Sequence, residues 1–428
     1  MIKINKKIFK NIIVLLTTSA LVKLLGMLSK ILLTNFTGLE VIKLYTLIVP
    51  TFMLVVSISQ FSFPISISKI VADNKYDDND IIKNSLYISL FINIVLSIIL
   101  FFSANLISKL IGFKELNICI KAIILILPFV SISAIIRGFL YGKENMVYSS
   151  YSNILEEIVK ILLIVFLIPI FINISKVLSV SAIILFNIIT EIVSIFYLKY
   201  KINKLYYIKK GKLKIKVLKD IFKLSITTTF IKVLGTIGYF LEPIILLKLL
   251  MNTGLSKEYI TTEYAIISSY IIPLLNMPTF FTGILATVYL PNLTKLFNSK
   301  KEKEFDKKVI SLSFLSIIIG IICIIFIIIF QDFLLEKIYN LNVTRNYINQ
   351  IAPVFLFLYI QPILSMAIQA SNKITKLFYI VIISLILKYL VLFIFTSLQF
   401  GIISFLIYIS AGIIINTISM ILLIIKKG

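Results

Sequence analysis

The sequence has no histidine and no tryptophan, and it contains only two cysteines and two arginines. Without histidine there is no histidine acid–base pair and no histidine metal site, and neither a P-loop glycine pattern nor paired carboxylates in a polar loop are present. Cys119 and Cys323 lie in apolar segments, where buried free thiols are expected rather than a disulfide or metal centre. These absences predict no catalytic residue, no metal and no cofactor, and so a protein that is not an enzyme.

Charged residues are also scarce, at 14% of the 428 residues, whereas 59% are hydrophobic and the mean hydropathy is +1.05. A soluble globule of this size cannot bury so much apolar surface. The apolar stretches recur at a length of about 20 residues, which suits a helix that crosses the bilayer core with its backbone groups paired internally. We therefore predict an all-α polytopic membrane protein.

About twelve transmembrane helices are predicted, in two pseudo-symmetric lobes of six. The expected spans are 11–35, 43–68, 84–110, 118–140, 155–173, 178–198, 220–250, 264–291, 309–331, 350–370, 377–398 and 402–425. The longest hydrophilic loop lies in the middle of the chain. It divides the sequence into an N-terminal six-helix lobe at 1–198, a basic cytoplasmic linker at 199–219 and a C-terminal six-helix lobe at 220–428.

The loops alternate in their content of lysine and arginine. Every second loop, counted from the N-terminus, is basic, and together these segments hold 28 lysines and arginines against 9 in the loops between them. Basic loops remain on the cytoplasmic side of a membrane. The bias predicts a multi-pass protein of the bacterial cell membrane with both termini in the cytoplasm. It also accounts for the net charge of +24 without a nucleic-acid partner.

The two halves share a short pattern. Lys23–Gly26 in the first span corresponds to Lys232–Gly235 in the seventh, and Lys160 in the fifth span has a counterpart in Lys388 of the eleventh. A unit that is repeated with the same orientation is typical of transporters whose site lies between the two halves.

Lysines within the spans are the predicted substrate-binding residues. A charge in hydrocarbon is costly, so such residues tend to face a water-filled cavity or a partner. Lys23 and Lys30 are seven residues apart and project from one face of a helix. Five lysines are predicted to line a positive cavity for an anionic phosphate headgroup: Lys23, Lys30, Lys160, Lys232 and Lys388. Snorkelling to the interface, or pairing with a carboxylate such as Glu191 or Glu242, is the alternative.

Acids and prolines within the spans supply further candidates. Glu156, Glu191 and Glu242 are predicted to serve either as coupling sites for a proton or cation or as structural ion pairs. Glu156 and its neighbour Glu157 lie one turn before Lys160 and are expected to pair with it. Predicted gating kinks lie at Pro50, Pro64 and Pro243.

Three segments carry a family resemblance: Ser19–Lys30, Phe63–Asp73 and Arg137–Glu157. They are similar to the stage V sporulation protein B and polysaccharide-exporter branch of the MATE-like (MOP) flippase superfamily. The third segment resembles the family's Arg-Gly, Gly, Asn-Met and Ser-x-x-x-Glu pattern through Arg137, Gly138, Gly142, Asn145, Met146, Ser152 and Glu156. In the second half, Ala286–Lys295 resembles the corresponding family segment.

The resemblance implies two six-helix lobes around a central cavity that opens alternately to each side. It implies a flippase for undecaprenyl-pyrophosphate-linked sugars, peptidoglycan precursors or polysaccharide units. The implied partners are this lipid-linked glycan, membrane lipids, and enzymes of cell-wall or polysaccharide synthesis.

Two other functions are open to the same residues. A cation-coupled multidrug antiporter of the same superfamily would need acids in its cavity, whereas the first span has two lysines and no acid. A scaffold or membrane glycosyltransferase would need large polar loops with carboxylates for a nucleotide-sugar and its metal. The richest acidic loop, Asp73–Asp80, is short and suits a solvated turn.

Overall fold

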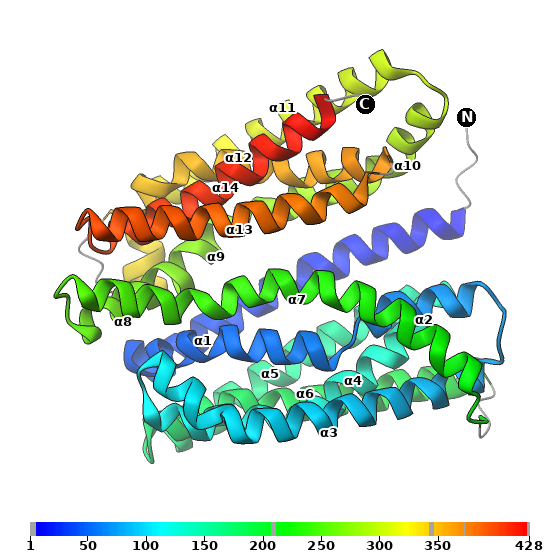
Figure 1. Ribbon diagram of the computed structural model, residues 1–428, viewed down its shortest axis with the longest axis horizontal. Helices are drawn as coiled ribbons and strands as arrows, with labels where there is room; N and C mark the ends of the chain where they lie inside the picture. The colour runs from blue at the N-terminus through cyan, green and yellow to red at the C-terminus, as the bar shows by residue number, and fades with distance from the viewer. Residues whose placement is uncertain (1–5, 207–210, 342–345, 372, 426–428) are drawn as a thin grey trace. The chain divides into compact units, whose positions relative to one another are not determined.

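The computed structural model describes residues 6–206, 211–341, 346–371 and 373–425, and in this part of the chain the regular elements are all helices. The chain forms two compact units, with the division between residues 244 and 245. The α-helices of the first unit are α1 (Lys6–Ser59), α2 (Phe63–Ala72), α3 (Asp78–Ile111), α4 (Asn117–Gly142), α5 (Met146–Ile172), α6 (Lys176–Leu205) and most of α7 (Ile215–Asn252). Those of the second are α8 (Lys257–Ile266), α9 (Ile272–Asn276), α10 (Thr279–Asn298), α11 (Glu302–Ile329), α12 (Tyr347–Ala370), α13 (Ile374–Ser397) and α14 (Ile403–Ile425) (Figure 1).

The helices have the length and polarity of membrane spans. Within the described residues, nine are long and apolar enough to cross a membrane, or ten if the bent pair 257–276 and 279–298 forms one span. α5 is not among the nine, since Glu156, Glu157 and Lys160 interrupt its apolar sequence. The prediction of an all-α polytopic membrane protein is confirmed, while the count of twelve spans stays a prediction.

α1 contains the first predicted span and most of the second in one element. Gly38 interrupts it with φ 70° and ψ 177°, a backbone conformation that glycine adopts without the steric cost of a Cβ. Pro50 lies within the second half of this helix. Within the second predicted span, 43–68, the left-handed residues Phe61 and Ser62 end α1 at Ser59, and the apolar segment continues into α2. Pro64 then lies in the first turn of α2, where its missing N–H costs no helical hydrogen bond.

The first unit is centred on α4, which packs against α2, α3 and α6, while α5 packs against α1 and α6. A buried hydrophobic cluster of this unit includes Phe63 and Ile67 of α2, Phe139 of α4 and Ile221 of α7. The N-terminal part of α7 therefore contributes to the core of the first unit.

In the second unit α12 packs against α10, α11 and α14, and α13 packs against α14. Tyr359 of α12 donates its hydroxyl hydrogen to the carbonyl of Leu275 at 2.7 Å, which satisfies a polar group in a buried position. Gly320 of α11 lies against the Tyr359 ring. A small residue here lets α11 and α12 approach closely.

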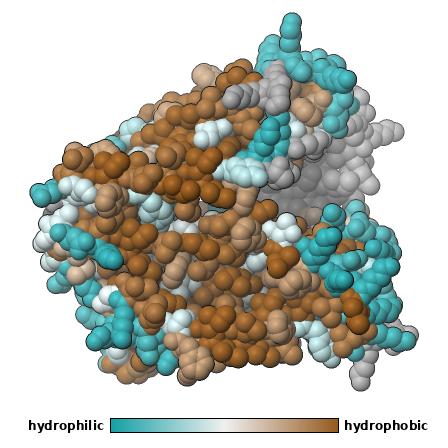
Figure 2. All heavy atoms as spheres, in the orientation of Figure 1, coloured by the Kyte–Doolittle hydropathy of each residue, from teal (hydrophilic) through white to brown (hydrophobic). Residues whose placement is uncertain are grey.

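Large apolar side chains cover the outer surface of the helices. Phe102, Phe196 and Ile329 are 77%, 70% and 69% exposed. Figure 2 shows hydrophobic residues in brown over the flanks of the helices and hydrophilic residues in teal near their ends. Such an exposed apolar area does not suit water and is the surface that the hydrocarbon core of a bilayer covers.

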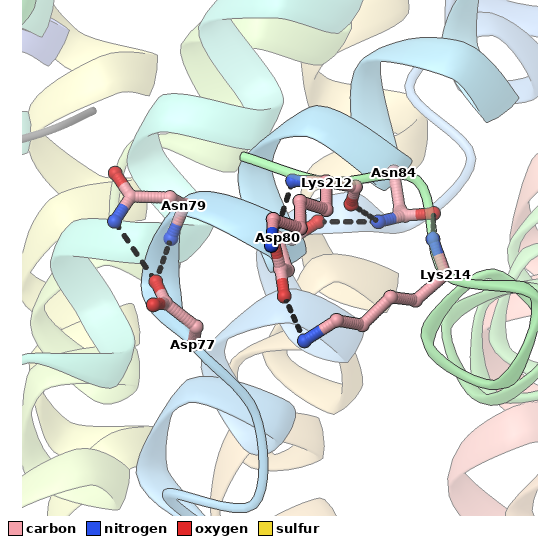
Figure 3. A network of polar contacts seen from close by, with 6 residues as sticks. All are labelled: Asp77, Asn79, Asp80, Asn84, Lys212 and Lys214. Atoms are coloured by element: carbon pink, nitrogen blue, oxygen red, sulfur yellow. Dashed lines mark hydrogen bonds and ion pairs between the residues drawn. The ribbon is translucent and has the colours of Figure 1, made fainter. Parts of the chain in front are cut away.

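A polar clamp holds the segment between α6 and α7 against the start of α3 (Figure 3). Asp80 accepts the backbone N–H of Lys212 at 2.6 Å and pairs with the Lys214 ammonium at 2.5 Å. Asn84 donates to the Lys212 carbonyl at 3.0 Å and accepts the Lys214 N–H at 3.1 Å. Hence Lys212 and Lys214 of the predicted linker are bound to α3 of the first unit by three hydrogen bonds and one ion pair.

The connection between the middle helices is shorter than the linker expected at 199–219, because α6 continues to Leu205 and α7 begins at Ile215. Residues 207–210 of that linker lie outside the described residues. The division between the compact units falls after Ile244, directly beyond Pro243 of α7. The six-helix lobes at 1–198 and 220–428 stay a prediction about domain organisation.

Candidate functional site

The first unit holds a set of charged side chains within its apolar helices. α1 supplies Lys23 and Lys30, α4 supplies Arg137, α5 supplies Glu156, Glu157 and Lys160, and α6 supplies Glu191. Charges at such depth are expected to pair or to face a polar cavity. Their partners decide which of them are available to a ligand.

Arg137 and Glu156 form the centre of this set. The Nη2 group of Arg137 donates to the Glu156 carboxylate in close contact and to the Ser194 hydroxyl of α6 at 3.2 Å. The two charged side chains are only 17% and 20% exposed, so the pair is largely removed from solvent. It joins α4, α5 and α6 through one guanidinium, which is suited to several simultaneous hydrogen bonds.

Glu191 lies beside this pair. Its carboxylate lies near Ser133 and is close enough to Arg137 and Glu156 to interact with both charges. Oε2 of Glu191 and Nε of Arg137 are buried and have no hydrogen-bond partner within the described residues. The carboxylates of Glu156 and Glu191 carry two negative charges, and Arg137 compensates only one of them. The remaining negative charge can be compensated by one proton or one small cation.

A second contact joins α1 to α5. The ammonium of Lys160 pairs with the Glu157 carboxylate at 3.8 Å. Lys160 is also close enough to Lys30 of α1 for the two positive charges to repel each other. Gly26, one turn before Lys30, faces the same place, since a Cβ there would lie 3.8 Å from Oε2 of Glu157. Lys30 of α1 and Lys160 of α5 therefore lie near each other, and the Glu157 carboxylate lies where these two helices meet.

The remaining lysines lie apart from this network. Lys232 on α7 is exposed and donates to Oε1 of Gln60 at 2.8 Å, at the break between α1 and α2. Lys23 is exposed on α1. Lys388 belongs to the second unit, where its ammonium lies 4.7 Å from the ring centroid of Tyr408 in a cation–π contact.

Glu242 and Pro243 are both buried in α7. The carboxylate of Glu242 is close enough to interact electrostatically with the hydroxyl of Tyr239, one turn earlier in α7. The proline removes a backbone hydrogen bond at this level of the helix, so the acid lies at a weak point of α7.

Comparison with known proteins agrees with this architecture. The profile of the polysaccharide biosynthesis protein family matches residues 8–297. The chain belongs to this family. It is 29% identical to stage V sporulation protein B of Bacillus subtilis (strain 168) over 379 residues, which covers 85% of this chain and 73% of the relative. It is 22% identical to sporulation protein YkvU of the same organism over 363 residues, or 83% of this chain and 80% of the relative.

Solved structures show the same fold. An inward-facing multidrug resistance MATE family transporter of the MOP superfamily aligns with a TM-score of 0.74 at 15% identity, over 97% of this chain and 96% of the other. An outward-facing structure of such a transporter aligns with a TM-score of 0.65 at 14% identity, over 97% and 94%. The family resemblance is confirmed. This member of the polysaccharide biosynthesis family is a multi-pass bacterial membrane protein of the flippase or exporter type.

The family motif in α4 has a packing role in this member. A Cβ on Gly138 would come within 2.7 Å of the Phe63 carbonyl oxygen, and one on Gly142 within 2.6 Å of Val71 Cβ. The two glycines, four residues apart, form the surface on which α2 lies. Arg137, next to Gly138, projects into the charged network instead.

The structure revises one predicted pairing. Glu156 and Glu157 were both expected to pair with Lys160, but only Glu157 does so, because Glu156 points to Arg137 on the neighbouring helix. Sequence reasoning from spacing found the contact within α5 and missed the one between helices. The signal was present in the family motif, which contains both Arg137 and Glu156.

Proposed function

We propose that the protein moves a lipid-linked oligosaccharide or peptidoglycan precursor, carried on undecaprenyl pyrophosphate, across the cell membrane by alternating access. The observation that carries the proposal is the family match over residues 8–297, in a chain with lysines inside its apolar helices. The glycan carrier would bring a pyrophosphate, for which flexible ammonium groups are suitable ligands.

The lysines divide into two groups by their surroundings. Lys23 and Lys232 have exposed side chains and are the first candidates for the pyrophosphate. Lys30 and Lys160 lie close to Glu157, and Lys388 lies against aromatic rings, so these three differ in their surroundings from the exposed Lys23 and Lys232. All five are proposed headgroup ligands in at least one state of the transport cycle.

The carboxylates are the proposed coupling groups. Glu156 and Glu191 share Arg137, and uptake of a proton by either would change how firmly α4, α5 and α6 are tied together. Glu242 would couple at the Pro243 level of α7, and Pro50, Pro64 and Pro243 are proposed as the bends that gate the cavity. No resident metal or cofactor and no catalytic step are part of the proposal.

The test is a flipping assay in proteoliposomes with a fluorescent undecaprenyl-pyrophosphate-linked sugar. The parent protein should move the lipid between leaflets, and the Lys23→Ala/Lys232→Ala variant should lose most of this activity while inserting normally. Lys199→Ala, which removes an exposed lysine of α6, is the matched control and should flip at the parent rate. Normal flipping by the double variant would contradict the assignment of the headgroup lysines.

A cation-coupled multidrug antiporter is the second candidate, because the fold is shared with MATE transporters. It predicts ethidium efflux driven by a proton or sodium gradient and abolished by Glu242→Gln. Ethidium efflux without lipid flipping would favour this candidate over the first. Lipid flipping without ethidium efflux would exclude it.

A further inference from the structure

A groove of about 470 Å³ lies between the end of α2, the loop after it and the first turns of α7. Its walls belong entirely to the first unit. The charged residues that line it are Lys69, Asp73, Lys75, Asp220 and Lys223. None of them takes part in the intramembrane network or in the proposed headgroup set.

The walls of the groove are held together by a packed seam. Ser225 of α7 donates to Ser66 of α2 at 2.6 Å, with both hydroxyls buried. The rings of Phe61 and Phe222 lie 5.5 Å apart between the same two parts of the chain. The groove beside this seam is consequently preformed, which spares a ligand the cost of ordering it.

One of its carboxylates is already neutralised. Asp220 accepts the Tyr76 hydroxyl at 2.6 Å and pairs with Lys75 at 3.2 Å. The hydrogen bond and charge of Asp220 raise the pKa of Lys75, which favours the charged form of this ion pair. Lys75 and Asp220 thus cancel each other and leave the other two lysines to set the sign of the groove.

Those two lysines have no partner among the described residues. Lys69 and Lys223 are exposed, and neither ammonium makes a hydrogen bond or ion pair with any described residue. Asp73 is the one further carboxylate on the lining, so the groove has three lysines against two aspartates. Lys216, close enough to Asp220 to act on its charge, adds another cation nearby.

Exposed apolar residues lie close in sequence to the groove lining on each helix. Phe222, Ile226 and Phe230 form the α7 stripe, at four-residue intervals on this helix, and are 41%, 46% and 61% exposed. On α2, Ile65 is 62% exposed one turn before Lys69. Ile226 and Phe230 lie further from the loop before α7 than Lys223 does, and Ile65 lies further from the loop after α2 than Lys69 does.

We propose that this groove binds the phosphate headgroup of an anionic membrane phospholipid, with Lys69 and Lys223 as its ligands and the acyl chains along the α7 stripe. Two ammonium groups suit a phosphate as point charges, and basic pockets at the ends of membrane helices are favourable sites for such headgroups. The α7 stripe adds an apolar surface that can contact acyl chains, whereas a free phosphate ion has no apolar part to place on it. Hence the pairing of charge and apolar surface points to a lipid.

The test is native mass spectrometry of the purified full chain titrated with phosphatidylglycerol, with phosphatidylcholine as the zwitterionic lipid. The parent should retain phosphatidylglycerol in preference to phosphatidylcholine. Lys69→Gln/Lys223→Gln should weaken phosphatidylglycerol binding by about fivefold for each lysine removed. The control Lys199→Gln/Lys303→Gln removes the same charge from two other exposed positions and should bind as the parent does.

The Phe230→Ser variant distinguishes binding of a phospholipid from binding of a free phosphate ion. It should weaken phosphatidylglycerol binding without altering the thermal stabilisation that inorganic phosphate produces. Equal retention of phosphatidylglycerol by the groove variant and its control would overturn the proposal. So would stabilisation by inorganic phosphate together with no preference for phosphatidylglycerol, because the groove would then be a free-phosphate site. The binding readout is independent of flipping.

Discussion

Gly211 crosses the first turn of α3 so closely that a Cβ at this position would overlap the carbonyl oxygen of Asn79. The approach places the following residues against Asp80 and Asn84, whose side chains bind the backbone of Lys212 and Lys214. The segment before α7 therefore needs a residue without a side chain at its first contact.

Gly211→Ala should destabilise the protein by about 1–3 kcal/mol, the usual cost of forcing an extra methyl group into a packed site. The measurement is thermal unfolding in detergent. Gly235→Ala is the matched control, since among the described residues no atom beyond the adjoining part of its own helix lies within 4 Å of the position a Cβ would occupy there. It should be neutral or slightly stabilising, because alanine favours the helix. Equal effects of the two changes would contradict the close approach at Gly211.

The Asp80–Lys214 pair should give a pH-dependent contribution to stability. The hydrogen bond and charge of Asp80 raise the pKa of Lys214 above its ordinary value. For a cation whose pKa is raised on folding, the stabilisation is present below the ordinary pKa and is lost as the pH rises through the raised value. Lys214→Met should accordingly lower the melting temperature at pH 7.5, and the difference from the parent should shrink toward pH 11.

The control for this measurement is Lys219→Met, which removes a neighbouring exposed lysine that has no hydrogen bond or ion pair among the described residues. Its melting temperature should follow that of the parent at every pH. A constant offset between the Lys214→Met variant and the parent across the alkaline range would mean that the stabilisation is not the ion pair.

Arg137 and Glu156 should show strong energetic coupling. Removing one member of a buried ion pair leaves the other charge without compensation and costs about 3–5 kcal/mol. Arg137→Met and Glu156→Gln should each lower stability by this order, and the double variant should lose less than the sum. A double-mutant cycle on unfolding free energies measures the coupling. Additive losses would show that the two side chains act independently.

The orientation of the chain is open to a direct test. The alternation of basic loops predicts that both termini and the α6–α7 connection lie in the cytoplasm. A green fluorescent protein fused after Ile425 should fluoresce, and alkaline phosphatase at the same place should be inactive. Alkaline phosphatase fused in the loop after Ile111 should be active. The reverse result at either position would overturn the orientation.

Much of the architecture was predictable because it depends on local properties. The length of an apolar run and its lack of charge are sufficient to place a membrane helix. The predicted spans around α4, α6 and α11 fall on these helices with small shifts at their ends. Helix ends were less predictable. Phe61 and Ser62 follow the end of α1 with positive φ, and neither is a glycine, the residue from which a left-handed conformation would have been expected.

The pairing of charges was not accessible in the same way. Spacing of three or four residues predicts contacts along one helix, and it correctly joined Glu157 to Lys160. It cannot tell which faces of two helices meet, so Arg137 and Glu156 were recognised as motif residues and not as partners. The five candidate lysines illustrate the same limit, since the structure pairs Lys160 with an acid and Lys388 with a ring.

Composition and residue order were thus enough to establish the membrane class, the helical content and the family, because each follows from sequence-local chemistry or motif. Tertiary packing alone decided that Lys69 and Lys223, 154 positions apart in the chain, line one groove. It also decided that the α6–α7 connection is bound to α3. Both depend on how helices distant in sequence pack against one another, which the free energy of the whole fold determines.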